Sequence, residues 1–154
     1  MSREGMVHAL KQIRRVLKPH GVLADLRPDR FSDPDQPHPR PPSIRWASGG
    51  RELPAGVLEK APENLQRHRA ATLELHRAIR QGLFVPESTE TYPFRFHFRT
   101  QEIFETFLRI GWKQTTLEVP ARRRLQAIQR AHPKGRIVVI EPFRLNILKK
   151  QGGG

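Results

Sequence analysis

The chain has 154 residues and no cysteine, which excludes a disulfide framework, cysteine-ligated zinc and a thiol nucleophile. With 28 Lys plus Arg against 15 Asp plus Glu, its formal charge is +13, and such a balance attracts anions, including nucleic acid. The length suits one domain over residues 1–150, and the apolar runs are far shorter than the roughly 20 residues that span a bilayer, so we expect a cytoplasmic protein with no membrane partner.

The first predicted elements are a helix, a sharp turn and a strand between Met6 and Pro28. Apolar residues recur at helical spacings of four, three and four, at Met6, Leu10, Ile13 and Leu17. Pro19 ends this helix, and Gly21 is expected to take the left-handed conformation at its exit. The compact, mostly apolar run Val22–Leu26 predicts a strand of a parallel sheet with both faces covered.

The least regular segment follows, over residues 29–62. Eight of the fourteen prolines lie between Pro28 and Pro62, which predicts a Pro-rich flexible insertion. Within it, two short runs at residues 43–46 and 51–53 flank the glycines of 47–50 and predict a hairpin. The insertion either covers a substrate cleft or forms a plain surface loop.

A long helix is predicted from Pro62 to Gln81, because proline suits its first position and Glu63 its N-terminal end. His68 and His76 lie about two turns apart on it. Without a carboxylate at ligand spacing, we interpret them as ordinary helix histidines rather than metal ligands.

The next strand, Tyr92–Phe98, alternates aromatic and cationic residues: Phe94, Phe96 and Phe98 against Arg95, His97 and Arg99. We favour an aromatic core face, although the same pattern can stack and hold nucleic-acid bases.

The last third continues with a helix capped by Thr100 and a stretch, 112–119, that is either strand or loop. A basic helix from Pro120 to Arg130 and a final strand region over 136–149, interrupted by Pro142, follow. Residues 151–154 are expected to be a disordered tail.

The helix–turn–strand unit resembles the R-V-L-K/R-P-G-G unit that leads into the fifth strand of class I S-adenosylmethionine-dependent methyltransferases, of the type 11-like group. The matching residues are Arg15, Val16, Leu17, Lys18, Pro19, Gly21, Val22 and Leu23. His20 departs from the pattern, because the family usually has its first glycine there. Glu141-Pro142-x-x-Leu145 resembles a pattern in the family's last strand. An ordinary helix–turn–strand unit of another α/β protein is the competing explanation.

The resemblance implies an α/β, partial Rossmann-like methyltransferase fold. Its small mixed sheet would have strands near 22–27, 92–98 and 136–148 with packed helices, and the last strand would run antiparallel beside 22–26. Only the family's C-terminal half has a counterpart, because no Gly-x-Gly occurs before residues 152–154. S-adenosylmethionine is therefore implied by resemblance only, and none is expected to bind this chain alone. A wrongly assigned start codon, a degraded gene and a split enzyme all fit.

Three polar residues at the end of the first strand, Asp25, Arg27 and Asp29, are the substrate-side candidates. In open α/β sheets the carboxyl ends of the strands form the ligand side. The competing interpretation is that all three are strand-end surface residues. No catalytic, cofactor-binding or metal-binding residue is assigned, and the methyl acceptor stays open.

The expected partner is a complementary N-terminal half, or a second copy that associates through the edge of strand 22–26. The alternative function is a small basic nucleic-acid-binding module that uses the aromatic strand and the arginine-rich helix. Binding by such a module would weaken steeply with salt.

Overall fold

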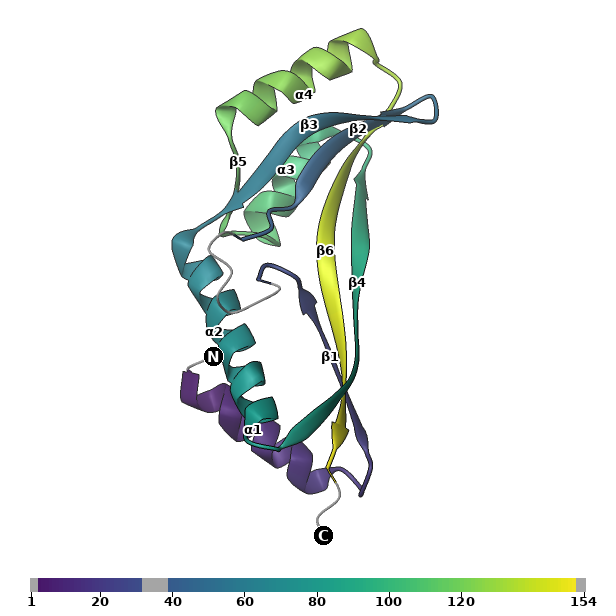
Figure 1. The fold of residues 1–154 in the computed structure, drawn as a ribbon. Coiled ribbons are helices and arrows are strands. Elements are labelled where there is room, and N and C mark those ends of the chain that lie inside the picture. The colour runs from purple at the N-terminus through teal and green to yellow at the C-terminus, as the bar shows by residue number, and fades with distance from the viewer. Residues whose placement is uncertain (1–2, 32–38, 152–154) are drawn as a thin grey trace. The chain divides into compact units, whose positions relative to one another are not determined.

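The computed structural model describes residues 3–31 and 39–151, which divide into two compact units (Figure 1). The first unit combines Met1–Pro39, Leu65–Tyr92 and Phe143–Gly154, and the second combines Arg40–Asn64 and Pro93–Pro142. The chain was expected to form a single domain. Two long strands contribute to both units, and each of them passes from one unit to the other at a proline, Pro93 or Pro142. Of the tail predicted at 151–154, residues 152–154 lie outside the described residues.

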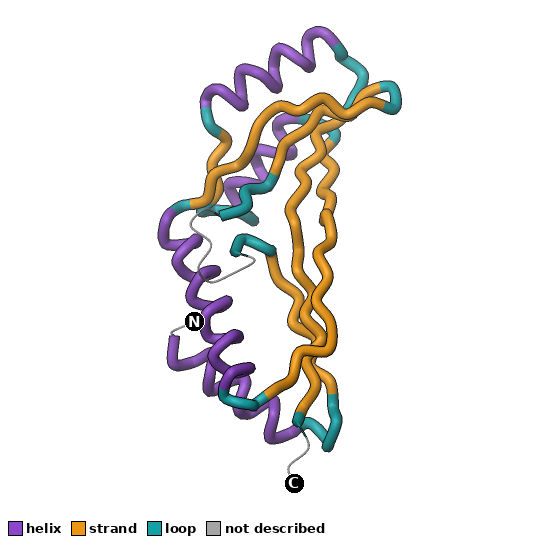
Figure 2. Tube along the Cα trace, in the orientation of Figure 1, coloured by secondary structure: helices purple, strands orange, loops and turns teal. Residues whose placement is uncertain are grey.

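Four helices and six strands make up the described chain (Figure 2). The helices are α1 (Arg3–Val16), α2 (Pro62–Arg80), α3 (Gln101–Ile110) and α4 (Val119–Ala131). The strands are β1 (Val22–Pro28), β2 (Ser43–Ser48), β3 (Arg51–Lys60), β4 (Phe84–Phe98), β5 (Thr115–Leu117) and β6 (Arg136–Lys150). The three strands predicted near 22–27, 92–98 and 136–148 are thus confirmed, and the 112–119 stretch contains the short β5.

The strand pairing is antiparallel, so the predicted mixed sheet is wrong. The hydrogen-bonded order is β1-β6-β2-β3-β5, and β4 also pairs with β6. β6 runs antiparallel to β1, to β2 and to β4. These three strands therefore point the same way, and each is hydrogen-bonded to β6 rather than to another of the three. The expectation that the last strand lies antiparallel beside 22–26 is confirmed, with Val22 opposite Lys149 and Leu26 opposite Leu145.

In the first unit, α1 and α2 lie on the same side of β1 (Figure 1). Their shared core consists of Leu10, Leu75, Ala78, Phe84 and Leu148, with Leu23 at its margin. The other face of β1 carries Val22 and Leu26, which are 48% and 57% exposed. The prediction that both faces of this strand are covered is therefore wrong, because α1 and α2 pack on one face only.

The turn between α1 and β1 has the features of a type II turn over residues 18–21. The Gly21 amide donates to the Lys18 carbonyl at 2.9 Å, and Pro19 occupies the position where proline is common. The left-handed residue is His20, with φ of 59°, and not Gly21 as predicted. Gly21 is needed for space instead, because a Cβ there would lie 2.8 Å from the Lys18 carbonyl oxygen.

In the second unit, β2 and β3 form the predicted hairpin, turning at Gly49 and Gly50 with φ of 56° and 77°. Much of the segment expected to be a flexible insertion is thus regular structure. The reason is an apolar face that packs with residues of α3, α4, β5 and β6. The buried members of this core are Ile44, Trp46, Ala55, Leu58, Phe98, Phe104, Leu108, Leu117, Ala121, Leu125, Ile137 and Val139.

β4 confirms the aromatic core face for Phe96 and Phe98, whereas Phe94 is 49% exposed. Phe98 is buried, and Phe96 packs against Phe107 and Trp112 with ring centroids 5.9 and 5.3 Å apart. Thr100 caps α3 as predicted, since its hydroxyl accepts from the Ile103 amide at 3.2 Å.

β6 continues through Pro142 instead of stopping there. Its residues 136–140 pair with β2, and its residues 143–149 pair with β1. Pro142 falls between these two ladders, so its missing N–H removes no hydrogen bond to β1 or β2.

Candidate functional site

The three sequence-predicted site residues lie along one side of β1 and its end. Asp25 is directly opposite Asn146 of β6, and Arg27 is opposite Arg144. Because side chains alternate across a strand, this is the face that also carries Leu23 and therefore the face that α1 and α2 cover. We call Asp25, Arg27, Asp29, Arg144 and Asn146 the polar cluster.

Asn146 connects three strands at one end of the polar cluster. Its side-chain amide donates to Asp25 Oδ2 at 2.8 Å and accepts from the Thr89 hydroxyl of β4 at 3.1 Å. Arg27 Nε lies 3.1 Å from the same Asp25 oxygen. With both ends of its amide engaged, Asn146 holds the Asp25 carboxylate in a defined position beside Arg27.

At the other end, Asp29 is removed from water. It is 2% exposed, its Oδ1 lies 3.2 Å from Arg144 Nη2, and its Oδ2 accepts from the Thr91 hydroxyl at 3.5 Å. The next residue, Arg30, is 1% exposed. A buried charge is costly unless it is paired, and Arg144 supplies the pair. The interpretation of Asp29 as a strand-end surface residue is therefore wrong.

Arg27 of the polar cluster has an unsatisfied hydrogen-bond donor. Its Nη1 is buried and has no hydrogen-bond partner among the described residues. Burial lowers the pKa of Arg27 from its ordinary value, Asp25 opposes this, Arg144 adds to the lowering, and Asp29 opposes it. A buried donor without a partner costs about 1–3 kcal/mol. The described residues therefore leave one buried donor of Arg27 unsatisfied.

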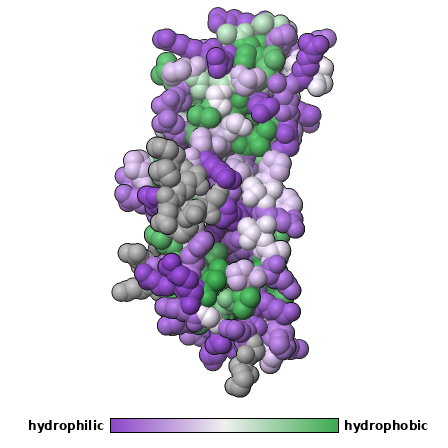
Figure 3. Space-filling model, viewed as in Figure 1, coloured by the Kyte–Doolittle hydropathy of each residue, from purple (hydrophilic) through white to green (hydrophobic). Residues whose placement is uncertain are grey.

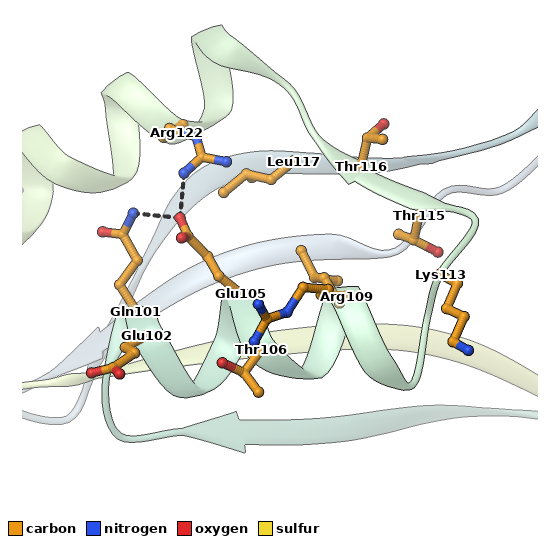
Figure 4. A pocket seen from close by; sticks show the side chains of 11 residues that line it. Gln101, Glu102, Glu105, Thr106, Arg109, Lys113, Thr115, Thr116, Leu117 and Arg122 are labelled. Atoms are coloured by element: carbon orange, nitrogen blue, oxygen red, sulfur yellow. Dashed lines mark hydrogen bonds and ion pairs between the residues drawn. The ribbon is translucent and has the colours of Figure 1, made fainter.

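A hollow of about 830 Å³ lies within the second unit between α3, β5 and α4 (Figure 4). Glu105 stands at its centre and accepts from Gln101 Nε2 at 2.8 Å and from Arg122 Nη1. Arg109 and Lys113 also line it, and in the described part of the chain neither forms an ion pair. The hollow suits a small polar ligand. No local sequence motif predicts this hollow, because its side chains come from three separate elements.

The cations of β4 do not share a face with its rings. Phe94, Phe96 and Phe98 alternate with Arg95, His97 and Arg99, and Phe96 and Phe98 are packed in the core of the second unit. The cationic face of β4 therefore offers no stacking ring of its own. Hydrophilic side chains cover much of the face of the molecule drawn in Figure 3.

Two further properties concern the described residues only. No three of their His, Asp or Glu side chains gather closely enough to hold a metal ion. None of their helices combines the length and the apolar character that crossing a bilayer requires.

Comparison with known proteins leaves the family open. The chain matches no family model, no curated protein and no solved structure. The argument for function therefore comes from the residues and their arrangement.

Proposed function

We propose that this chain is the C-terminal portion of an S-adenosylmethionine-dependent methyltransferase-like protein with a partial Rossmann-like fold. The observation that carries the proposal is the antiparallel pairing of β6 with β1, directly after the unit Arg15–Leu23. In the family that the unit resembles, the last strand has this neighbour and this direction.

The arrangement around β1 adds support. β1 and β4 both run antiparallel to β6, so they point the same way with β6 between them. Helices α1 and α2, which precede and follow β1 along the chain, pack into one core on one face. Helices that connect strands of the same direction and cover the sheet are typical of α/β folds.

The free side of β1 suits a complementary N-terminal half. β1 is the last strand in the hydrogen-bonded order of the described chain, so its other edge pairs with no described strand. Val22 and Leu26 beside this edge are exposed. Proteins rarely leave such an edge uncovered, and the missing strands of the family's sheet would cover it.

Within this proposal the polar cluster lies on the substrate side. Asp25, Arg27 and Asp29 occupy the carboxyl end of β1, where open α/β sheets bind ligands. Asn146 and Arg144 hold the two carboxylates on either side of Arg27, so the cluster forms a fixed polar lining at this end of β1. The chain alone is inactive because its sequence has no glycine-rich loop for the cofactor.

The test is the genomic reading frame upstream of Met1, followed by expression of the extended protein. We expect an in-frame strand followed by an acidic-x-Gly-x-Gly-x-Gly loop. In calorimetric titration the extended protein should bind S-adenosylmethionine about one to one, and the 154-residue chain should give no saturable signal. The matched control is the extended protein with the loop glycines replaced by alanine. Micromolar binding by the 154-residue chain, or an extended protein that never binds, would refute the proposal.

A further inference from the structure

The β2–β3 turn of the second unit borders a hollow of about 460 Å³ that is rich in cations. Four basic residues from three separate stretches of the chain line it: Arg51, Arg99, Lys134 and Arg136. We propose that this hollow binds a small ligand with adjacent phosphate groups, such as the polyphosphate part of a nucleotide. The proposal concerns the second unit alone and does not depend on the methyltransferase assignment.

The loop that carries Lys134 is held firmly against β2. Trp46 Nε1 donates to the His132 carbonyl at 2.9 Å, and the Ser48 hydroxyl donates to the Lys134 carbonyl. At Gly135 a Cβ would lie 2.6 Å from the Ala47 carbonyl oxygen, so only glycine permits this approach. The backbone that carries Lys134 and Arg136 is therefore in place before any ligand arrives, which lowers the entropic cost of binding.

The turn leaves room for a ligand beside its backbone. Gly49 and Gly50 are both left-handed, as two-residue hairpin turns require. A Cβ at either glycine would meet nothing within 4 Å. A bulky anion can thus approach the main chain here without displacing a side chain.

The charges of the hollow are not balanced internally. Among the described residues, none forms an ion pair with Arg51, Arg99, Lys134 or Arg136. The lining carboxylate, Glu52, is bound by Arg95 and lies 3.9 Å from Arg45. Several cations held together without counter-charge repel one another, and a polyanion relieves that repulsion. Guanidinium groups match phosphate oxygens in geometry as well as charge.

The size and surroundings favour a small ligand over a nucleic-acid strand. The volume falls in the range of small-molecule sites, roughly 300–1,000 Å³. A strand-binding groove needs aromatic platforms beside its cations. The rings of β4 point to the opposite face from Arg99 and pack partly in the core.

The test is calorimetric titration of the full chain with inorganic tripolyphosphate. The wild type should bind about one equivalent, and Lys134→Gln/Arg136→Gln should weaken binding about tenfold or more. Arg123→Gln/Arg130→Gln on α4 removes the same charge from exposed positions outside the hollow, and it should change affinity less than about twofold. A second hollow variant, Arg99→Gln/Lys134→Gln, and thermal unfolding of all variants separate lost binding from lost folding.

A second arm compares ligands of shared chemistry. A nucleoside triphosphate that binds more tightly than tripolyphosphate identifies a nucleotide site, and equal affinities identify a polyphosphate site. Equal losses in the hollow and control variants would overturn the proposal, because they indicate diffuse attraction. Tripolyphosphate that fails to bind, while single-stranded DNA binds more tightly as its length increases, would also overturn it.

Discussion

Replacing His20 by glycine is expected to stabilise this protein, although the change removes a side chain. His20 is the third residue of the turn 18–21 and has φ of 59°. A Cβ at this φ crowds the backbone, which is why type II turns favour glycine at this position. His20 is exposed, and no hydrogen bond of the described residues uses its side chain, so its removal sacrifices no contact.

The magnitude follows from two opposing terms. A non-glycine residue in the left-handed region costs roughly 1–2 kcal/mol. Glycine loses more backbone entropy on folding, and this opposing term destabilises the variant by roughly 0.5–1 kcal/mol. The net gain for His20→Gly is therefore about 0.5–1 kcal/mol, which raises Tm by about 1–4 °C in a chain of this length.

Thermal unfolding followed by circular dichroism measures the effect, with His20→Ala as the matched control. Alanine also removes the imidazole but keeps the Cβ, so it should bring no gain. Gly21→Ala should instead destabilise by about 1–3 kcal/mol, because the new Cβ would lie 2.8 Å from the Lys18 carbonyl oxygen. If His20→Gly is no more stable than His20→Ala, the strain argument is wrong.

Two further predictions concern the first unit. Asp29→Asn should cost about 3 kcal/mol in urea unfolding, because it removes the buried carboxylate charge that pairs with Arg144. Glu87→Gln, which breaks the exposed pair with Lys149, should cost less than about 1 kcal/mol, and equal effects of the two changes would contradict the argument. In light scattering at several concentrations, the wild type should self-associate through the open edge of β1, and Leu26→Lys should reduce this. Ile110→Lys, at an exposed apolar residue of α3, should leave it unchanged, and a wild type that stays monomeric throughout would show that the edge is already capped.

Local patterns predicted the helices well, because their causes are local. The spacing of Met6, Leu10 and Ile13 was enough for α1, and the Thr100 hydroxyl bonds to an amide only three residues away. It was harder to predict which side chains of a strand are buried and which are exposed. In β6, Asn146 and Leu148 are both buried, while the apolar Leu145 and Ile147, which alternate with them, are partly exposed. The partners of β6, and not its own alternation, decide which side is covered.

The candidate site was predictable in part for the same reason. Asp25, Arg27 and Asp29 could be identified because they share one strand end. Their partners Thr91, Arg144 and Asn146 belong to strands more than 50 residues away along the chain, and the pairing of β6 with β1 and with β4 brings them together. Burial of Asp29 also depends on these partners, so the strand sequence by itself favoured a surface position.

The second unit shows why the segment 29–62 was expected to be flexible. Its apolar residues Ile44, Trp46 and Leu58 are too few to build a core by themselves. They are covered by Phe104 of α3 and Leu125 of α4, which belong to the later segment 93–142. The two segments are separate insertions into the chain order α1, β1, α2, β4 and β6, and each supplies the face that the other lacks. A sequence window that contains only one of them has nothing to offset its chain entropy, and the hairpin becomes stable only when both are considered together.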